Sequence, residues 1–340
     1  MPEYLRPGTL AQGLALLQQS VQPLSTTPSQ QGAVSTTATA TVPPGDQDLL
    51  RIVAGATDVY PSKVSQRTWQ GGLAERWLDI SAIDELASIE ETEEHWRIGA
   101  MVTWSDLIAA SLPEMFTSLK QAAREVGGQQ IQNRATLVGN LCNASPAADG
   151  VPPLMCLDAS VELSRAGGQR TLALADFLQG NRKTARRADE LVTAIIVPRQ
   201  SDSRHQWPSA QQAAGNDGST FTSSFYKLGS RRYLVISIVM ASALIQTDAE
   251  GVITACHFAV GACAPVATRL HELEKALTGQ SIKTLLQKPQ SLHQSDLAKY
   301  ISPISDVRAS ADYRSQMVSR VLHELLERHS KVASVRGLSS

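Results

Sequence analysis

The spacing of hydrophobic residues in the N-terminal part of the chain predicts alternating helices and strands. Residues 9–17 place leucines on one helical face behind the Thr and Gln of a capping box, which predicts a short helix. The apolar runs 49–61, 77–80 and 95–103 predict strands, and the first of them enters a turn at small residues and a proline. Residues 112–128 predict a helix, because a proline stands near the start of an apolar face and two glycines close the segment.

The rest of the chain mixes strand and helix patterns in the same way. Residues 160–174 predict a hairpin around Gly167 and Gly168, and residues 190–198 predict a further strand. Strands are expected after that at 221–230, 234–247 and 251–262, and helices at 267–279, 291–301 and 311–329. The pattern as a whole predicts a mixed α and β protein without an obvious repeat.

Two polar segments interrupt this pattern. Residues 21–45 contain no charged residue and are crowded with Ser, Thr, Pro and Gln. Such a composition buries too little apolar area to offset its ordering entropy, so a flexible insertion is expected. Residues 199–219 hold loop formers with little periodicity and are expected to divide the first body from the last third.

Composition and charge exclude several classes of protein. A length of 340 residues allows two or three domains, and 31 basic against 32 acidic residues leave no electrostatic footprint for nucleic acid or an anionic membrane. The four cysteines lie far apart and never form a CxxC pair, which argues against a disulfide framework or a metal cluster and fits a cytoplasmic location. No membrane span and no export signal are expected.

Standard catalytic and nucleotide signatures are absent from the sequence. GxGxxG, GxxxxGK[ST], GxSxG and HExxH do not occur, and the seven histidines are scattered singly. Cys142 has no histidine near it in sequence and apolar or amide neighbours, so we expect a packed, inert thiol. No metal site and no catalytic side chain are predicted.

The segment VAGATDV, residues 53–59, has the composition of a ligand loop. Its small residues around Gly55 let the backbone pass close to a ligand, and successive N–H groups of such a turn can hold a pyrophosphate without a lysine. Thr57 adds a hydroxyl, and Asp58 is expected to accept hydrogen bonds from N–H or ligand hydroxyl groups. An ordinary tight strand exit fits this segment alone equally well.

Residues 135–154, ATLVGNLCNASPAADGVPPL, repeat this chemistry at greater length. Thr136, Gly139 and Asn140 offer a hydroxyl, an open backbone and an amide, and Asn143 and Asp149 add further polar groups. Small polar groups beside apolar ones suit a large ligand with an aromatic ring and hydroxyls. A purely structural turn is the alternative.

Together these segments resemble the flavin subunit or domain of the molybdenum hydroxylases, the xanthine dehydrogenase family. The matching pieces span nearly the whole chain in order: YLRPGTLAQGLALL (4–17), VAGATDV (53–59), ATLVGNLCNASPAADGVPPLMCLDASVEL (135–163), FYKLGSRR (225–232), GACAPVATR (261–269) and SDVRASADYR (305–314). The unmatched sequence lies mainly in the two polar segments.

The resemblance implies a mixed α/β (α+β) fold of the PCMH or vanillyl-alcohol-oxidase and MurB type. Two α/β subdomains would grip FAD between them, and an α+β C-terminal domain would follow. On that model the first subdomain is 1–60, with the insertion 21–45, and the second is 61–200. A polar linker at 201–220 would precede the C-terminal domain at 221–335.

The resemblance also implies where FAD is bound. The first FAD loop would be Ile52, Val53, Ala54, Gly55, Ala56, Thr57, Asp58 and Val59, and the second Thr136, Leu137, Val138, Gly139 and Asn140, both wrapping the pyrophosphate. Asp149 would contact ribityl or ribose hydroxyls, so Asp149→Ala is expected to weaken FAD retention by roughly 1 to 3 kcal/mol. Further contacts would be Val126, Asn143, Val192 and Lys227. Lys227 would stabilise reduced, anionic states of the flavin, unless it is a surface lysine on a strand edge.

Three departures from the family pattern matter. Ala56 and Val138 stand where many relatives have a second glycine, which is tolerable if their φ angles are negative. Relatives that use NAD often carry an acidic pair shortly after the lysine, whereas this chain has Arg231 and Arg232, so the electron acceptor stays open. The insertions contain no cysteine, so no iron–sulfur cluster is expected in this chain.

The implied function is that of an FAD-carrying electron-transfer subunit in a complex. A molybdopterin-binding large subunit would hydroxylate the substrate, and a [2Fe-2S] small subunit would pass electrons to this chain for delivery to NAD+ or another acceptor. The complex is expected to be a dimer of heterotrimers. The alternatives are a stand-alone flavin oxidoreductase of the same fold and a non-enzymatic assembly protein that has lost FAD.

Overall fold

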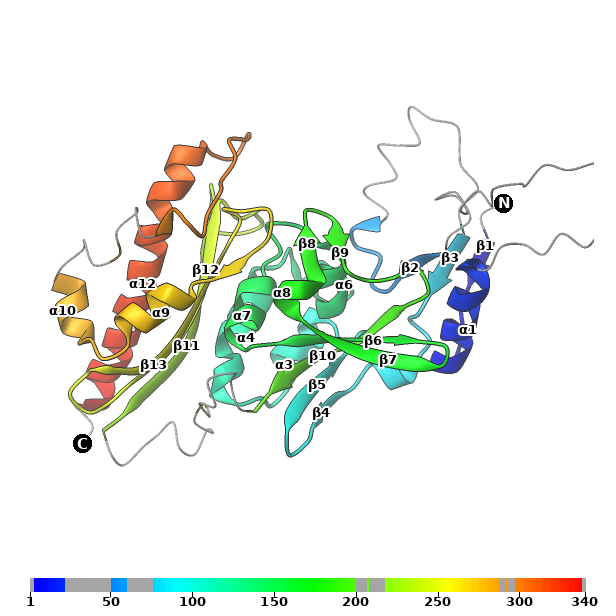
Figure 1. Cartoon of the computed structure of the whole chain (residues 1–340), viewed down its shortest axis with the longest axis horizontal. Helices are drawn as coiled ribbons and strands as arrows, with labels where there is room; N and C mark the ends of the chain where they lie inside the picture. Colours follow the sequence, from blue (N-terminus) through cyan, green and yellow to red (C-terminus); the bar gives the residue numbers. More distant parts are fainter. Residues whose placement is uncertain are drawn as a thin grey trace, which may run out of the picture.

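Three bodies follow one another along the long axis of the molecule (Figure 1). The computed structural model describes residues 3–21, 50–59, 76–199, 207, 218–287, 292 and 297–337. Most of the predicted insertion 21–45, most of the predicted linker and part of the predicted helix 291–301 lie outside these residues. The described residues confirm the predicted mixed α/β class.

The N-terminal body is a small parallel sheet with one helix. Its strands are β1 (Glu3–Leu5), β2 (Arg51–Val53) and β3 (Arg76–Asp79), in the order β1-β3-β2, and α1 (Leu10–Val21) follows β1. Because β3 pairs with both other strands, the boundary predicted at residue 60 falls between strands of one sheet. The sheet cannot form without the strand that lies between β1 and β2.

The middle body contains a five-stranded antiparallel sheet. Its order is β4 (Ile89–Glu91), β5 (His95–Gly99), β10 (Leu191–Pro198), β6 (Ser160–Arg165) and β7 (Gly168–Ala173). The predicted hairpin and the predicted strand at 190–198 are confirmed. The strand predicted at 95–103 ends at Gly99.

Short helices and one small hairpin complete the middle body. They are η1 (Asp84–Leu86), α3 (Trp104–Ala109), η2 (Glu114–Phe116), α4 (Thr117–Glu125), α5 (Gln129–Gln132), α6 (Leu137–Asn143), α7 (Val151–Cys156), α8 (Leu174–Phe177), β8 (Leu178–Gly180) and β9 (Lys183–Thr184). Residues 135–154, expected to be a loop, thus contain α6 and the start of α7. Pro152 and Pro153 lie in the first turn of α7, where their missing N–H groups cost nothing.

The C-terminal body is a four-stranded antiparallel sheet between two layers of helices. The sheet runs β11 (Thr220–Leu228), β12 (Val239–Thr247), β13 (Ile253–Gly261) and β14 (Thr268–Arg269). The helices α9 (His271–Leu277), α10 (Ile282–Gln287) and α12 (Ala311–Gly337) lie on the far side of the sheet from the middle body (Figure 1). Helices α4 and α7 contact the sheet from the middle body, so the two bodies share an interface.

Candidate functional site

The first predicted FAD loop lies against the backbone just before the second. A Cβ at position 55 would overlap the carbonyl oxygen of Arg134 and lie 2.9 Å from the Cα of Ala135. Residue 55 must therefore be glycine for the turn after β2 to reach the residues that precede α6. The contact joins segments 79 positions apart in sequence (134 minus 55).

Ala56, the next residue of the first loop, has a left-handed backbone. Its φ is 61°, so the condition of a negative φ, under which alanine would be tolerable here, is not met. Val138 lies in α6 and is not among the described residues with positive φ. The loop thus keeps at residue 56 the backbone conformation that glycine adopts most easily.

Ala56→Gly is expected to raise the free energy of unfolding by about 0.5–1 kcal/mol. Left-handed backbone costs an L-residue roughly 1–2 kcal/mol, and the greater freedom of glycine in the unfolded chain offsets part of the gain. Urea unfolding of the apoprotein measures the change. Ala173→Gly is a control, because Ala173 has a φ of −55° and the same change should lower stability there. Equal effects at both positions would contradict the assignment of strain to Ala56.

The second predicted loop begins a helix instead of forming an open nest of N–H groups. Thr136 caps α6, and its hydroxyl accepts from the Gly139 amide at 3.0 Å. The Leu137 and Asn140 amides donate to the carbonyls of Val102 and Thr136, both at 3.1 Å. These three amides are therefore already bonded within the protein.

A side chain of this segment, in contrast, has unused hydrogen-bonding capacity. Asn140 Oδ1 is buried and finds no hydrogen-bond partner among the described residues. A buried acceptor without a donor is costly, and a ligand hydroxyl would satisfy it. FAD carries such hydroxyls on its ribityl chain and ribose, so the residues present fit this cofactor.

Asp149 and Lys227 form a buried ion pair between the middle and C-terminal bodies. Lys227 Nζ lies 2.7 Å from Asp149 Oδ2, and the two side chains are only 5% and 10% exposed. The ammonium also donates to the carbonyl of Glu125 at 3.1 Å, and the Ser237 hydroxyl donates to Asp149 Oδ1 at 2.8 Å. Burial raises the pKa of Asp149, and the bonds from Lys227 and Ser237 oppose that rise. The alternative of Lys227 as a surface lysine is therefore wrong.

The other predicted contacts lie on three different elements of the middle body. Val126 follows Glu125 at the end of α4, and Asn143 is the half-buried last residue of α6. Val192 is 2% exposed in β10, a core strand against which α6 packs. Cys142 is exposed as a residue, but burial raises the pKa of its thiol to about 11, so the thiol stays protonated and the expectation of an inert group is supported.

Two residues near the site were missed from sequence. Arg182 connects the first loop to the β8–β9 hairpin, because its Nη1 lies 3.5 Å from Asp58 Oδ2 and its amide donates to the Ala144 carbonyl at 2.9 Å. The basic run at 182–187 is a signal that could have drawn attention to it. Ser237, the second partner of Asp149, stands in an ordinary polar position of the sequence and gives no such signal.

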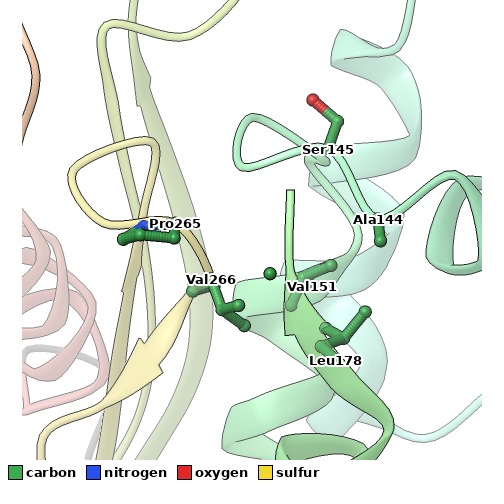
Figure 2. A pocket seen from close by; sticks show the side chains of 8 residues that line it. Ala144, Ser145, Val151, Leu178, Pro265 and Val266 are labelled. Atoms are coloured by element: carbon green, nitrogen blue, oxygen red, sulfur yellow. The ribbon is translucent and has the colours of Figure 1, made fainter. Parts of the chain in front are cut away.

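A small apolar hollow lies at the same interface (Figure 2). Figure 2 shows Val151, Leu178 and Val266 facing one another across it, with the Ser145 hydroxyl pointing away. None of the predicted FAD contacts lines the hollow. The residues that line it are Ala144, Ser145, Val151, Leu178, Gly180, Pro265, Val266 and Ala267. The hollow is therefore separate from the polar centre around Asp149.

The described part of the chain holds neither a cluster of metal ligands nor a membrane-spanning helix. Within it, no three His, Cys, Asp or Glu side chains gather in a way that could hold a metal ion. No helix in these residues has the length and apolar character needed to cross a membrane.

Comparison with known proteins gives two family matches that cover most of the chain. Residues 2–200 match the FAD binding domain in molybdopterin dehydrogenase, and residues 224–329 match the CO dehydrogenase flavoprotein C-terminal domain. The chain is 29% identical over 280 residues to the nicotinate dehydrogenase FAD-subunit of Eubacterium barkeri, which covers 81% of this chain and 86% of that protein. It is 27% identical over 283 residues to the xanthine dehydrogenase FAD-binding subunit of Escherichia coli O157:H7, with coverages of 83% and 89%.

A solved structure agrees with the expected fold. Reconstituted CO dehydrogenase from Oligotropha carboxidovorans superposes with a TM-score of 0.73 at 24% identity and 97% coverage of both chains. The family matches confirm the resemblance to the flavin subunit of the molybdenum hydroxylases, and the structural match confirms the fold that this resemblance implied. The chain belongs to the family of FAD binding domains in molybdopterin dehydrogenases and is an oxidoreductase flavoprotein.

Proposed function

We propose that this chain carries FAD as the electron-transfer subunit of a molybdenum hydroxylase complex. It takes electrons from a [2Fe-2S] partner and passes them to NAD+ or another acceptor. The observation that supports this best is the backbone contact of Gly55 with Arg134 and Ala135, which brings the two motif segments of the family into one site.

Four features of the site would hold the cofactor. The turn at 54–58 offers closely approachable backbone to the pyrophosphate, and Asn140 Oδ1 accepts from a hydroxyl. Asp149 accepts a further hydroxyl, since each carboxylate oxygen has capacity beyond its one bond to Lys227 or Ser237. Lys227 places a positive charge in the site. Val126, Asn143 and Val192 complete the proposed contacts.

FAD, when bound, supplies the redox chemistry, and the protein supplies binding, orientation and charge. The Asp149 carboxylate offsets the Lys227 charge, so the pair is close to neutral when both groups are ionised. A buried pair of this kind changes the field at the cofactor whenever Asp149 gains a proton. We assign no proton-transfer role to any side chain of this chain.

Partners are proposed from the names of the relatives. Several are called FAD subunits or medium chains, such as the carbon monoxide dehydrogenase medium chain of Afipia carboxidovorans. We propose a molybdopterin-binding large subunit and a [2Fe-2S] small subunit, assembled as a cytoplasmic dimer of heterotrimers. Arg231 and Arg232 stand where relatives that use NAD often carry an acidic pair, so both NAD+ and other acceptors are candidates.

Co-expression with candidate partners tests this proposal. The purified complex is expected to contain molybdenum, iron and FAD, and anaerobic addition of a compound that the complex hydroxylates should bleach the flavin absorbance. The isolated chain should leave the substrate unchanged. Substrate turnover by the isolated chain would instead favour the stand-alone flavin oxidoreductase.

A further inference from the structure

A second polar network touches the site from the C-terminal segment 305–314. Its centre is Asp306, whose Oδ2 accepts from Arg308 Nε at 3.0 Å and Nη2 at 2.5 Å. Its Oδ1 accepts from Arg314 Nη2 at 2.7 Å and from the Arg308 amide at 2.8 Å. One carboxylate thus fixes the planes of two guanidinium groups.

Both arginines hold the segment that leads into β12. Arg308 Nη1 donates to the Ser237 carbonyl at 3.2 Å, and Arg314 Nη1 donates to the carbonyls of Ile238 at 2.7 Å and Ala262 at 2.9 Å. Ser237 and Arg314 are 0% and 1% exposed. Two consecutive carbonyls are therefore fixed by guanidinium groups, which limits how the backbone at Ser237 can move.

The network continues into the FAD site through the Ser237 side chain. The same residue that Arg308 holds by its carbonyl donates its hydroxyl to Asp149 Oδ1 at 2.8 Å. Asp149 in turn pairs with Lys227. A continuous series of bonds therefore connects Asp306 with the ion pair between the two bodies.

We propose that Arg308, oriented by Asp306, is a positioning residue that sets the Asp149–Lys227 pair for FAD through Ser237. This inference rests on the proposed function, because it assumes that the pair faces the cofactor. Arg308 does not touch the pair itself. Its role is to keep the Ser237 hydroxyl directed at Asp149.

These contacts could also serve only the stability of the fold. The test therefore needs measurements that do not change when stability alone changes. The first measurement is the coupling of two substitutions: Arg308 and Ser237 act in series, so removing both should cost no more FAD affinity than removing one.

The second measurement is the pH dependence of FAD binding. Asp149 faces Lys227 from β11, Ser237 from the start of β12 and the charge of Glu125 from α4. Loss of the Ser237 bond raises the pKa of Asp149 further, so protonation should weaken FAD binding at a higher pH.

The experiment measures FAD dissociation constants by flavin fluorescence for the full-length apoprotein. The variants are Arg308→Leu, Ser237→Ala and the double variant, each at pH 6 and pH 8. Arg170→Leu is the matched control, since Arg170 also grips a carboxylate with two nitrogens, Glu190 at 2.7 and 2.8 Å, and a carbonyl, Ala185 at 2.9 Å. The Arg170 and Arg308 side chains are 31% and 29% exposed, and the Arg170 contacts do not include Ser237.

Arg308→Leu and Ser237→Ala are each expected to weaken FAD binding about tenfold at pH 8 and more at pH 6, with the double variant no weaker than the worse single one. Arg170→Leu should unfold more easily but bind FAD as the unaltered chain does. Equal FAD affinities for Arg308→Leu and Arg170→Leu, or additive losses in the double variant, would overturn the inference while leaving the proposed function intact. Failure of the unaltered chain to bind FAD would overturn both.

Discussion

Asp149→Ala is expected to lower the free energy of unfolding of the apoprotein by about 3–5 kcal/mol, the cost of leaving a buried charge without its partner. Lys227 Nζ is 2.7 Å from Asp149 Oδ2, and its side chain is 5% exposed. After the substitution the ammonium keeps only the carbonyl of Glu125 among the partners seen here. This loss of stability is separate from the weaker FAD retention that the sequence predicts for the same substitution.

Urea unfolding without FAD measures this effect. Asp189→Ala is the control, because Asp189 pairs with Arg165 at 3.9 Å near the surface, with side chains 27% and 50% exposed, and such pairs contribute about 0–1 kcal/mol. The variant Asp149→Leu with Lys227→Met removes both charges and should recover much of the stability. A loss below about 1 kcal/mol in Asp149→Ala would show that the pair is open to water.

Gly55→Val is expected to reduce FAD affinity about 10- to 100-fold, because overpacking a tight backbone contact costs roughly 1–3 kcal/mol and here displaces the loop itself. The new Cβ would overlap the Arg134 carbonyl and lie 2.6 Å from its carbon. Arg134 cannot yield by a side-chain rotation, since the atoms concerned are backbone. The turn after β2 must therefore move away from the start of α6.

Fluorescence titration with FAD measures this loss, and circular dichroism checks that the fold persists. Gly168→Ala is a suitable control, since the nearest atom to a Cβ there is Arg165 Nε at 3.7 Å. That variant should bind FAD as the unaltered chain does. Unchanged affinity in Gly55→Val would mean that the contact between the two segments is not part of the FAD site.

Local patterns made much of the fold predictable from the sequence. The hairpin around Gly167 and Gly168 and the long C-terminal helix follow from period and turn chemistry, and the structure has both. The segment 135–154 was misread because its small polar residues favour loops, whereas Thr136 caps a helix and packing of Leu137 and Leu141 stabilises it.

The centre of the candidate site was less accessible from sequence. Asp149 and Lys227 were each identified through their motifs, but a pair separated by 78 positions forms only when the two bodies pack together. Ser237 enters the same network through its hydroxyl, and Arg308 enters it through the backbone carbonyl of Ser237, a contact that leaves no trace in residue type. The positive φ of Ala56 likewise depends on the turn that the contact at Gly55 imposes.

The central claim, that this chain carries FAD, is tested most directly by the visible spectrum of the purified full-length protein after incubation with FAD and removal of the unbound cofactor. The account predicts a yellow protein with the two absorption bands of an oxidised flavin and about one FAD per chain, as expected of a single site between the two contacting segments. A folded but colourless protein that retains no FAD would contradict it and would favour the assembly protein that has lost its cofactor.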